Sequence, residues 1–430
     1  MKLEDFDLRK EIIKSWNNTI TKKALVIYPK NISELIKLIK LIKIEKKNYL
    51  LRTGSCSYDS KSINPDPETL VISLSNINNI LKIDLKKSTI EIEAGALIVD
   101  VVRKIKNKNI TLFSVPGGNK ISIGGAISAN TIGKDSSRLI SSFGDALLSL
   151  TVLNADGKII KIVKKNSLNK YVGAFGMEGL ILKAKLRVKK IKSSNLLISS
   201  KILKDIKDVK KDLNTKSDYH YIQIDPFFRK KNFAISFRGQ TSKLKQNIYK
   251  NVNLKSYAFE EILFKFLGFF INSFTWRLFY KLFFLLNRKI IKVTDIHNFH
   301  YSSKYKHLIP LVCNNGLLDY EILIKNNFVR TVKNLIYFLK ENKIYPIYIV
   351  VKKIFKSKKK YNYQFNEDGY AFAMSIDKSL LKEKTIKSLH TFLLNNNLKL
   401  NLSKTDDKLI KLKSNKNNLF LSLYKKMLLK

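Results

Sequence analysis

The chain has 430 residues, 45% of them hydrophobic and 27% charged, which is enough apolar material for two folded domains and excludes a largely disordered protein. Its 81 Lys and Arg against 34 Asp and Glu give a formal net charge of +47, yet lysines occur in nearly every segment. Such a charge suits contact with polyanions, and an even bias toward Lys, Asn and Ile also produces it. With two cysteines, Cys56 and Cys313, the chain has no disulfide framework, and a reducing compartment is expected.

No long apolar segment is expected to cross a membrane. The N-terminal residues have neither the apolar run nor the cleavage site of a signal peptide. The most apolar stretch, Phe259 to Ile291, is interrupted by Lys265, Arg277 and Lys281, and so favours a helical hairpin or an interfacial helix. We therefore expect a cytoplasmic protein whose membrane contact, if it has one, is peripheral and at the inner face.

Strands and helices alternate in the first part of the chain. Asn31 suits the N-cap of a helix that begins at Ile32, with apolar residues at helical spacing to Ile42. The patterns predict strands at Ala24–Tyr28, Tyr49–Arg52, Leu70–Leu74 and Thr89–Glu93, a helix at Leu97–Lys106, a hairpin turn at Asp156-Gly157, and a strand that ends at Val188.

The composition changes near Ile191, where glycines become rare and aromatic residues increase. Strand patterns at Tyr219–Ile224, Phe233–Phe237, Tyr320–Ile324, Tyr345–Val351 and Ala371–Ile376 alternate with helical patterns at Arg330–Asn342 and Ser379–Asn395. This order predicts an α+β arrangement, with an antiparallel sheet covered by helices on one face.

Several common functional motifs are missing. The sequence has no phosphate loop of the G-x-x-x-x-G-K-[ST] type, no G-x-G-x-x-G turn, no C-x-x-C and no G-x-S-x-G. All five histidines lie after residue 219 and lack the spacing of metal ligands, so no metal site is expected. Nucleic-acid binding is not expected either, because it would rest on charge alone without a recognisable module.

Three glycine-bearing segments carry the positive signal. They are Leu51–Asp59, Val115–Lys134 and Tyr171–Leu180, and each lies next to a predicted strand. Small residues allow the backbone to approach a phosphate or a flat ring closely, with amide groups available to an anion. Three such segments in order predict a cofactor site.

The order and spacing of these segments resemble the FAD-binding domain of the vanillyl-alcohol oxidase / p-cresol methylhydroxylase (PCMH) superfamily. The likeness is long from Val115 to Gly157, where P-G, G-G-A-I and G-K are followed by Ser142-Phe143-Gly144-Asp145 and Ala155-Asp156-Gly157. The resemblance implies an α+β chain with a two-part PCMH-type FAD-binding domain at residues 1–190 and a substrate-binding domain at residues 191–400. It also implies that a C-terminal segment, residues 401–430, returns to the flavin site.

The same resemblance implies which residues bind FAD. They are Thr53, Gly54, Ser55, Cys56, Ser57, Tyr58, Asp59, Gly117, Ser122, Gly124, Gly125, Ala129, Ile132, Gly133, Ile181 and Asn401. Related oxidases attach the flavin through a histidine at the position of Cys56, so non-covalent FAD is expected here. A cysteinyl-flavin link is the alternative.

Within the superfamily, the likeness extends over nearly the whole chain to the decaprenylphosphoryl-β-D-ribose 2-oxidase family. Gly316–Ile322, Ile349–Ile354 and Leu402–Asp406 are similar to its G-F-Y-Q-Y-Q-F, A-V-L-K-R-F and T-T-K-D-S motifs. This implies Lys404 and Tyr58 as catalytic residues and Lys134, Glu321 and Lys352 as substrate-binding residues.

Four positions depart from the family pattern. Thr53 and Ser55 replace glycines, Ile132 replaces a histidine over the flavin, and Glu321 replaces a glutamine on the substrate side. A carboxylate at position 321 would repel a phosphate unless a lysine pairs with it. With these departures, the resemblance does not determine which sugar is the substrate.

The resulting hypothesis is an FAD-dependent oxidation of a sugar hydroxyl, the 2-hydroxyl of a polyprenyl-phosphate-linked pentose, as the first half of an epimerisation that a short-chain reductase partner completes. A soluble aldonolactone, alditol or sugar-acid oxidase on the same fold is the second hypothesis, with a free sugar as substrate. The third is a basic nucleic-acid- or membrane-binding protein whose flavin fold has lost activity.

Overall fold

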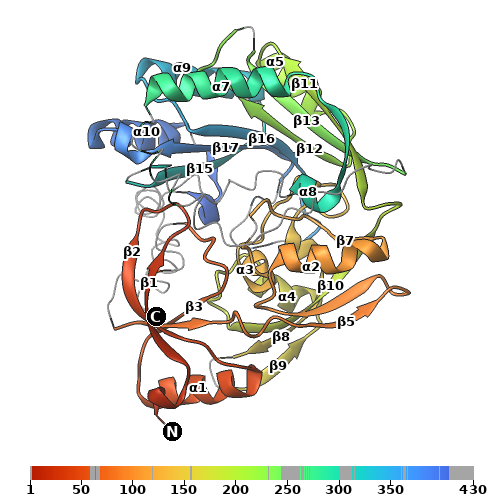
Figure 1. The fold of residues 1–430 in the computed structure, drawn as a ribbon, viewed down its shortest axis with the longest axis vertical. Coiled ribbons are helices and arrows are strands. Elements are labelled where there is room, and N and C mark those ends of the chain that lie inside the picture. Colours follow the sequence, from red (N-terminus) through yellow and green to blue (C-terminus); the bar gives the residue numbers. More distant parts are fainter. Residues whose placement is uncertain are drawn as a thin grey trace.

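The computed structural model describes residues 2–58, 63, 68–118, 120–154, 157–230, 232–243, 262, 266, 268, 270, 272–300, 312–313, 315–359, 361, 365, 367–396 and 398–405. The predictions on Asp59, on Asp156 and on residues 406–430 lie outside this set, as do those on most of residues 259–271. In the described part there are three sheets: the first two lie in the half of the molecule that contains helix α1 (Ile32–Ile44), and the third lies in the opposite half (Figure 1).

The first sheet contains four strands in the order β1 (Leu8–Lys14), β2 (Thr21–Ile27), β4 (Leu70–Ser73) and β3 (Tyr49–Arg52). The β1–β2 pair is antiparallel, whereas β2, β4 and β3 run parallel. Helix α1 (Ile32–Ile44) provides the crossover between β2 and β3. Its N-cap Asn31 accepts a hydrogen bond from the Glu34 backbone N–H at 2.9 Å, as the sequence predicts.

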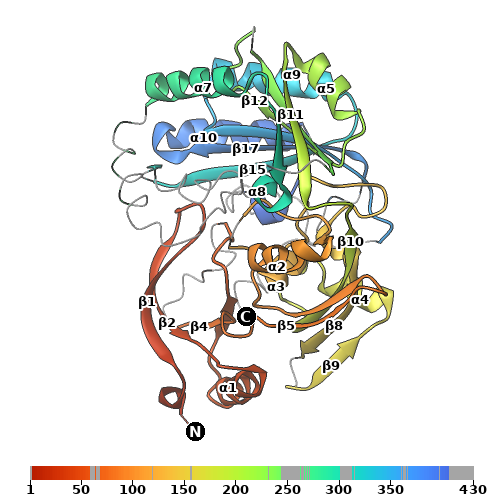
Figure 2. The same cartoon turned by 45° about the vertical axis from the view of Figure 1, so that its right-hand side comes forward.

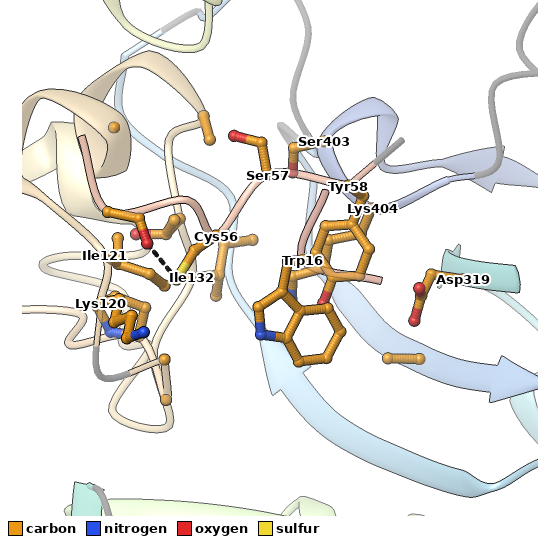
Figure 3. Close-up of a pocket in the computed structure, with 18 of the residues that line it drawn as sticks. Trp16, Cys56, Ser57, Tyr58, Lys120, Ile121, Ile132, Asp319, Ser403 and Lys404 are labelled. Carbon is orange, nitrogen blue, oxygen red and sulfur yellow. Dashed lines mark hydrogen bonds between the residues drawn. The ribbon is translucent and has the colours of Figure 1, made fainter. Parts of the chain in front are cut away.

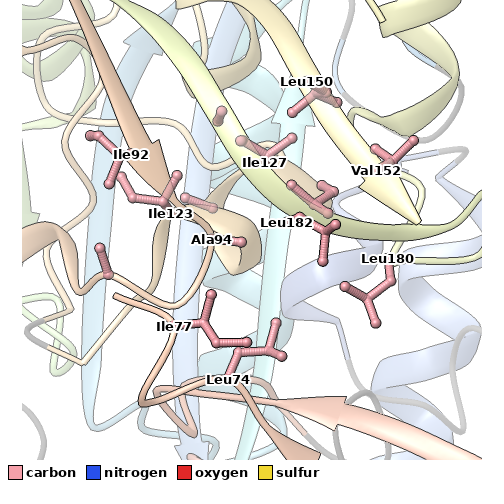
Figure 4. Packing of buried hydrophobic residues seen from close by; sticks show 14 of the residues in the cluster. Leu74, Ile77, Ile92, Ala94, Ile123, Ile127, Leu150, Val152, Leu180 and Leu182 are labelled. Atoms are coloured by element: carbon pink, nitrogen blue, oxygen red, sulfur yellow. The ribbon is translucent and has the colours of Figure 1, made fainter. Parts of the chain in front are cut away.

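The second sheet is antiparallel. Its order is β5 (Ile80–Asp84), β6 (Thr89–Glu93), β10 (Leu180–Lys190), β8 (Leu147–Leu153) and β9 (Ile159–Ile162), and β7 (Ile110–Leu112) also pairs with β10. Helices α2 (Ile98–Ile105), α3 (Ile123–Ser128) and α4 (Lys165–Tyr171) accompany it. Apolar side chains of α3, β6, β8 and β10 form one core with those of the first sheet, so residues before 190 pack as a single body (Figure 4).

The third sheet has eight antiparallel strands. Their order is β14 (Ile291–Asp295), β11 (Asn195–Leu203), β13 (Ala234–Thr241), β12 (Tyr219–Ile224), β16 (Tyr348–Ile354), β17 (Gly369–Asp377), β15 (Leu317–Ile324) and β18 (Lys399–Leu400). Residues alternate between its two faces, as expected for strands. On β15, Tyr320 and Ile322 point into the core, which places Asp319 and Glu321 on the opposite face.

Helices cover the core face of this sheet. Helices α5 (Ile206–Leu213), α9 (Phe328–Glu341) and α10 (Glu383–Asn395) share one apolar core with it. On the other face, Tyr280 and Phe284 of helix α7 (Ser273–Asn287) pack against Ile235 and Phe237, and α8 (Ile296–His300) follows β14. The α+β class and the helix-covered antiparallel sheet are therefore confirmed, with α7 as an addition on the second face.

Sequence periodicity located most elements but not all of them. The strands Tyr49–Arg52 and Thr89–Glu93 have the predicted bounds, whereas strand β16 begins at Tyr348 instead of Tyr345 and helix α10 begins at Glu383 instead of Ser379. Strands β1, β11 and β14 were not predicted, because charged residues in β1, the adjacent serines of β11 and the shortness of β14 hide the period of two.

Among the described helices, none is both long and apolar enough to cross a membrane.

Candidate functional site

A cavity of about 1490 Å³ lies between the first two sheets and the second face of the eight-stranded sheet. All three glycine-bearing segments contribute to its wall, and residues of β12, β15, β16 and β17 form the opposite side. Ordinary ligand pockets measure roughly 300–1,000 Å³, so this cavity has room for more than one small molecule. The sequence-predicted segments therefore do converge on one site.

The first segment needs a glycine and tolerates a serine at its turn. A Cβ on Gly54 would lie 1.3 Å from the carbonyl oxygen of Lys120, so only glycine permits this packing of two loops. Ser55 has a φ of +57°, the region in which the related family has glycine. Its Oγ accepts a hydrogen bond from Arg52 Nε at 3.0 Å, which helps to hold the left-handed turn without a glycine.

The second segment folds into a loop and the short helix α3. Ser122 caps α3 by accepting a hydrogen bond from the Gly125 backbone N–H at 3.2 Å. A Cβ on Gly124 would lie 3.1 Å from the Ala94 side chain, so glycine brings α3 close to the end of β6. The Gly133 N–H donates to Ser114 Oγ at 2.8 Å, which anchors the end of the loop.

The third segment turns on glycines with positive φ. Gly173, Gly176 and Gly179 have φ values of +73°, +83° and +140°. Gly176 and Gly179 line the cavity together with Ile181, the residue of the following strand that is predicted to contact FAD. With these glycines, backbone rather than side chains forms this wall.

A buried carboxylate organises the opposite wall. Glu321 Oε1 lies 3.2 Å from Lys404 Nζ and 3.8 Å from Lys352 Nζ. Its Oε2 accepts a hydrogen bond from Asn401 Nδ2 at 2.5 Å, and its backbone carbonyl accepts from the Asn401 N–H at 2.8 Å. Lys352 also donates to the Ile132 carbonyl at 2.7 Å, so it joins the third sheet to the second glycine-bearing segment.

The charges around Glu321 keep it ionised. Burial alone would raise the pKa of its carboxyl group, but the ammonium groups of Lys404 and Lys352, with hydrogen bonds from Lys404 and Asn401, lower it to about 2. The structure thus supplies the lysine pairing that a carboxylate requires at this position. Asn401 itself does not line the cavity but lies behind Glu321, which differs from its predicted place at the cofactor.

Tyr58 stands beside an aromatic residue that the sequence did not identify. Its ring centroid is 4.9 Å from that of Trp16, and both residues lie near Lys404 (Figure 3). Burial is the main cause that raises the pKa of the Tyr58 phenol well above its ordinary value, and Tyr348 and the Asp319 carboxylate add to it. The phenol is therefore protonated at neutral pH and can donate a hydrogen bond into the cavity.

Asp319 is a second carboxylate on the same wall. It lies two residues before Glu321 on β15, is buried, and accepts a hydrogen bond from Ser375 Oγ of β17. It was not among the residues predicted from the sequence, although the period of two in Leu317–Ile324 places it on the same face as Glu321. Trp16 carries no such signal, because it reaches the cavity through the pairing of Asn17 with Leu317.

Lys134 lies at an aromatic corner of the cavity. Its Nζ is 4.6 Å from the ring centroid of Tyr221 and 4.8 Å from that of Phe299, and it donates to the Phe299 carbonyl at 3.2 Å. His300 lines the same corner, where burial, together with Lys134 and Lys189, lowers its pKa well below the usual range. A neutral imidazole and one ammonium group thus face this end.

Most of the predicted site residues line the cavity. Those that line the cavity are Thr53, Gly54, Ser55, Cys56, Ser57, Tyr58, Gly117, Ser122, Gly124, Gly125, Ala129, Ile132, Gly133, Ile181, Lys134, Glu321, Lys352 and Lys404. Ile132 also packs its side chain against Leu323 and Ile354 of the third sheet. Cys56 Sγ donates to the Gly54 carbonyl at 3.5 Å (Figure 3).

Comparison with known families identifies the first part of the chain. Residues 23–162 match the family described as FAD binding domain. The chain contains an FAD-binding domain. The cavity fits this cofactor, because its volume exceeds that of an ordinary ligand pocket and its wall is formed by backbone at Gly54, Gly124, Gly176 and Gly179. FAD is thus confirmed as the predicted cofactor.

Relatives of the FAD-binding domain are oxidoreductases by name. The chain is 28% identical to reticuline oxidase of Eschscholzia californica over 34% of this chain and 27% of that protein. It is 23% identical to L-gulonolactone oxidase of Mus musculus over 40% of this chain and 39% of that protein. It is 25% identical to decaprenylphosphoryl-beta-D-ribose oxidase of Mycolicibacterium smegmatis over 28% of this chain and 26% of that protein. The matched segment thus covers well under half the length of each of these relatives.

The fold beyond the FAD-binding domain is also shared with solved structures. Cholesterol oxidase from B. sterolicum superposes with a TM-score of 0.69 at 12% sequence identity, over 94% of this chain and 87% of that one. At this identity the likeness is one of fold. It extends across the eight-stranded sheet as well as the FAD-binding domain.

Proposed function

We propose that the protein is an FAD-dependent oxidoreductase that oxidises a sugar hydroxyl, the 2-hydroxyl of a polyprenyl-phosphate-linked pentose. A short-chain reductase partner would complete an epimerisation by reducing the keto sugar. One observation carries the proposal: the cavity has a charged wall at Glu321 and Lys404 and an aromatic wall at Trp276 and Phe283 of α7. A substrate with a polar reacting end and an apolar tail suits this contrast.

When bound, FAD supplies the acceptor for the hydride that leaves the carbinol carbon. The residues of this chain then have to hold the hydroxyl oxygen while its proton passes to a base, a role that the Asp319 carboxylate on the same wall can take. Lys404 is suited to holding the oxygen, because its side chain lines the cavity and its ammonium group can stabilise a developing alkoxide. Glu321, at 3.2 Å, holds that ammonium group in place.

Tyr58 would orient the substrate through its phenol. Since burial keeps this phenol protonated at neutral pH, it acts in our proposal as a hydrogen-bond donor and not as the base. Lys352 is already held by Ile132 and Glu321, whereas Lys134 lies at the far corner of the cavity. Lys134 is held in turn by the Phe299 carbonyl, so we assign the substrate phosphate to these two ammonium groups without a preference.

The test is anaerobic bleaching of the flavin absorbance in stopped flow. A short prenyl-phosphoryl pentose should bleach the flavin faster than the matching free pentose or an aldonolactone. The 2-deoxy analogue of the same prenyl-phosphoryl pentose is the control, and it should leave the flavin oxidised. Equal or faster bleaching by the free sugars would contradict a lipid-linked substrate.

A soluble aldonolactone, alditol or sugar-acid oxidase is the second candidate. One observation favours it: Asp319 and Glu321 place two carboxylates side by side on the substrate wall, where they suit hydroxyl groups better than phosphate. A lactone oxidase is also among the relatives. Bleaching by free sugars in the same assay would support this candidate.

We infer that the flavin is held without a covalent bond. No histidine precedes residue 220, and the Cys56 thiol is turned toward the Gly54 carbonyl. Acid precipitation should therefore leave the yellow colour in the supernatant, and Cys56→Ser should retain a full complement of FAD. Flavin that stays with the precipitated protein, and is lost from it in Cys56→Ser, would show a cysteinyl link instead.

A further inference from the structure

The outward face of α7 is apolar. An α-helix turns by roughly 100° per residue, and at this spacing the exposed apolar residues of α7 fall on one stripe. They are Phe274, Leu278, Leu282, Leu285 and Leu286, each between 53% and 74% exposed. The opposite face of the helix is buried, and Tyr280 donates to the Ile347 carbonyl at 2.9 Å. A continuous apolar stripe of this kind on a protein surface marks a binding face.

Cations border the stripe and acidic residues are missing around it. Between residues 262 and 294 the sequence has six Lys and Arg and no Asp or Glu. Arg277, Lys281 and Arg288 occupy one flank of the helix, and all three are exposed. An apolar stripe with a cationic flank is the pattern of a helix that lies in the interface of an anionic bilayer.

A cationic recess adjoins the C-terminal end of α7. It has a volume of about 460 Å³, and Ser199, Lys201, Arg288 and Lys289 are among its lining residues. Ser200 shapes it, because its Oγ donates to the Asn287 carbonyl at 2.6 Å and accepts from the Ile290 N–H at 2.7 Å. This recess suits the phosphate of a lipid headgroup.

The stripe continues into the main cavity. Phe279 is 50% exposed beside the stripe and also lines the cavity, next to Trp276 and Phe283. The rings of Trp276 and Phe279 are stacked, with centroids 4.8 Å apart. Apolar surface therefore runs around the helix from the outside of the molecule to the inside of the cavity.

We propose that α7 seats the protein on an anionic bilayer. The stripe lies among the acyl chains, and the cationic flank and recess meet phosphate headgroups. The helix lies at the end of the molecule opposite α1 (Figures 1 and 2). The entry of a lipid tail along Phe279 rests on the proposed function, whereas the docking itself does not.

Vesicle sedimentation tests the docking with the full FAD-loaded chain. Binding to phosphatidylglycerol-containing vesicles should exceed binding to pure phosphatidylcholine vesicles and should weaken as salt is added. Leu278→Ser with Leu282→Ser should reduce binding about tenfold or more, because two apolar side chains no longer enter the bilayer. Tyr337→Ser, an exposed apolar residue on α9, is the matched control and should bind like the native chain.

Charge reversal tests the headgroup contact. Arg288→Glu with Lys289→Glu should abolish the preference for anionic vesicles, whereas Arg330→Glu with Lys333→Glu on α9 should keep it. Equal flavin content in all variants would show that they fold. Unchanged vesicle binding by the stripe variant would overturn the proposal. So would a native dimer in sedimentation velocity that the stripe variant loses, because the stripe would then bind a second copy.

The same variants separate docking from substrate chemistry. With a short, water-soluble prenyl-phosphoryl pentose, the stripe variant should bleach its flavin at the native rate. If no prenyl-linked sugar bleaches the native flavin while vesicle binding is intact, the proposed function fails and the docking stands. If bleaching is normal and vesicle binding is absent, the docking fails and the proposed function stands.

Discussion

Glu321 determines the chemistry of the substrate wall at the scale of single residues. Its carboxylate meets Lys404, Lys352 and Asn401, which come from three separate segments of the chain. Because the carboxylate is buried, removing any one of these partners leaves its negative charge less fully compensated. Two predictions follow from this arrangement, one for catalysis and one for pH.

Lys404→Ala should retain FAD and slow flavin reduction by substrate about 10²- to 10³-fold, the usual effect of removing one group that stabilises a developing charge. Stopped-flow reduction under anaerobic conditions measures this. Lys399→Ala is the matched control, since Lys399 pairs with Glu367 and does not line the cavity. Reduction at a near-native rate in Lys404→Ala would remove Lys404 from the reaction.

Glu321→Gln should make stability less dependent on pH in acid. The folded-state pKa of about 2 lies below the ordinary value of 4.5, so the carboxylate stabilises the fold fully above about pH 4.5. That contribution, roughly 3 kcal/mol, is lost as the pH falls from there toward 2. The urea midpoint of Glu321→Gln should therefore differ most from that of the native chain at pH 7 and least at pH 3.

The exposed Glu341→Gln on α9 serves as the control, with midpoints close to native at every pH. A difference between Glu321→Gln and the native chain that stays constant from pH 7 to pH 3 would show that shape or hydrogen bonding, and not charge, accounts for the effect.

At the scale of elements, the site depends on how closely loops pack. Gly54 lies against the Lys120 carbonyl, and the following Ser55 turns with a positive φ. These contacts bring the first and second glycine-bearing segments together, so that both can face one cofactor. The helix α3 depends on the same principle at Gly124 and Ala94.

Gly54→Ala should lose FAD, because its Cβ would overlap the Lys120 carbonyl and push the two segments apart. Gly157→Ala is a suitable control: Gly157 also has a restricted conformation, with φ +78°, but nothing lies within 4 Å of the added Cβ. The Gly157→Ala control should lower the free energy of unfolding by about 1 kcal/mol and should keep its flavin. Flavin absorbance after gel filtration measures both, and a yellow Gly54→Ala protein would show that the segments can separate without harm.

At the scale of the whole molecule, the cavity is enclosed by two bodies that meet across it. Lys352 is one link, from β16 of the third sheet to the Ile132 carbonyl of the FAD-binding domain. The pairing of Asn17 with Leu317 is another. The fixed position of the substrate wall relative to the cofactor depends on such contacts.

Lys352→Met should therefore lower the free energy of unfolding by about 1–3 kcal/mol, since the Ile132 carbonyl loses its donor and Glu321 keeps one lysine instead of two. Lys353→Met is the neighbouring control, because Lys353 reaches Asn214 on the other face of the sheet and does not line the cavity. Thermal unfolding of both variants gives the comparison. Equal melting temperatures would mean that Lys352 does not link the two bodies.

The sequence by itself determined the local features of this protein. Turn chemistry identified the three glycine-bearing segments, and periodicity identified α1, β3 and β6, because both depend on residues that are close in the chain. The resemblance carried by the same segments indicated FAD, which the match to residues 23–162 confirmed. Strand β11 was not predicted, since its three adjacent apolar residues and its two adjacent serines break the period of two.

Only the tertiary structure decided which distant residues meet. Glu321 and Lys404 are 83 residues apart, and sheet register and the return of the chain after β18 bring them within 3.2 Å. Trp16 lies beside Tyr58 because its backbone N–H donates to the Ser57 carbonyl at 2.9 Å, and α7 turns its leucines outward because its aromatic face packs on β13. Such contacts depend on packing among many elements at once, which no short window of sequence contains.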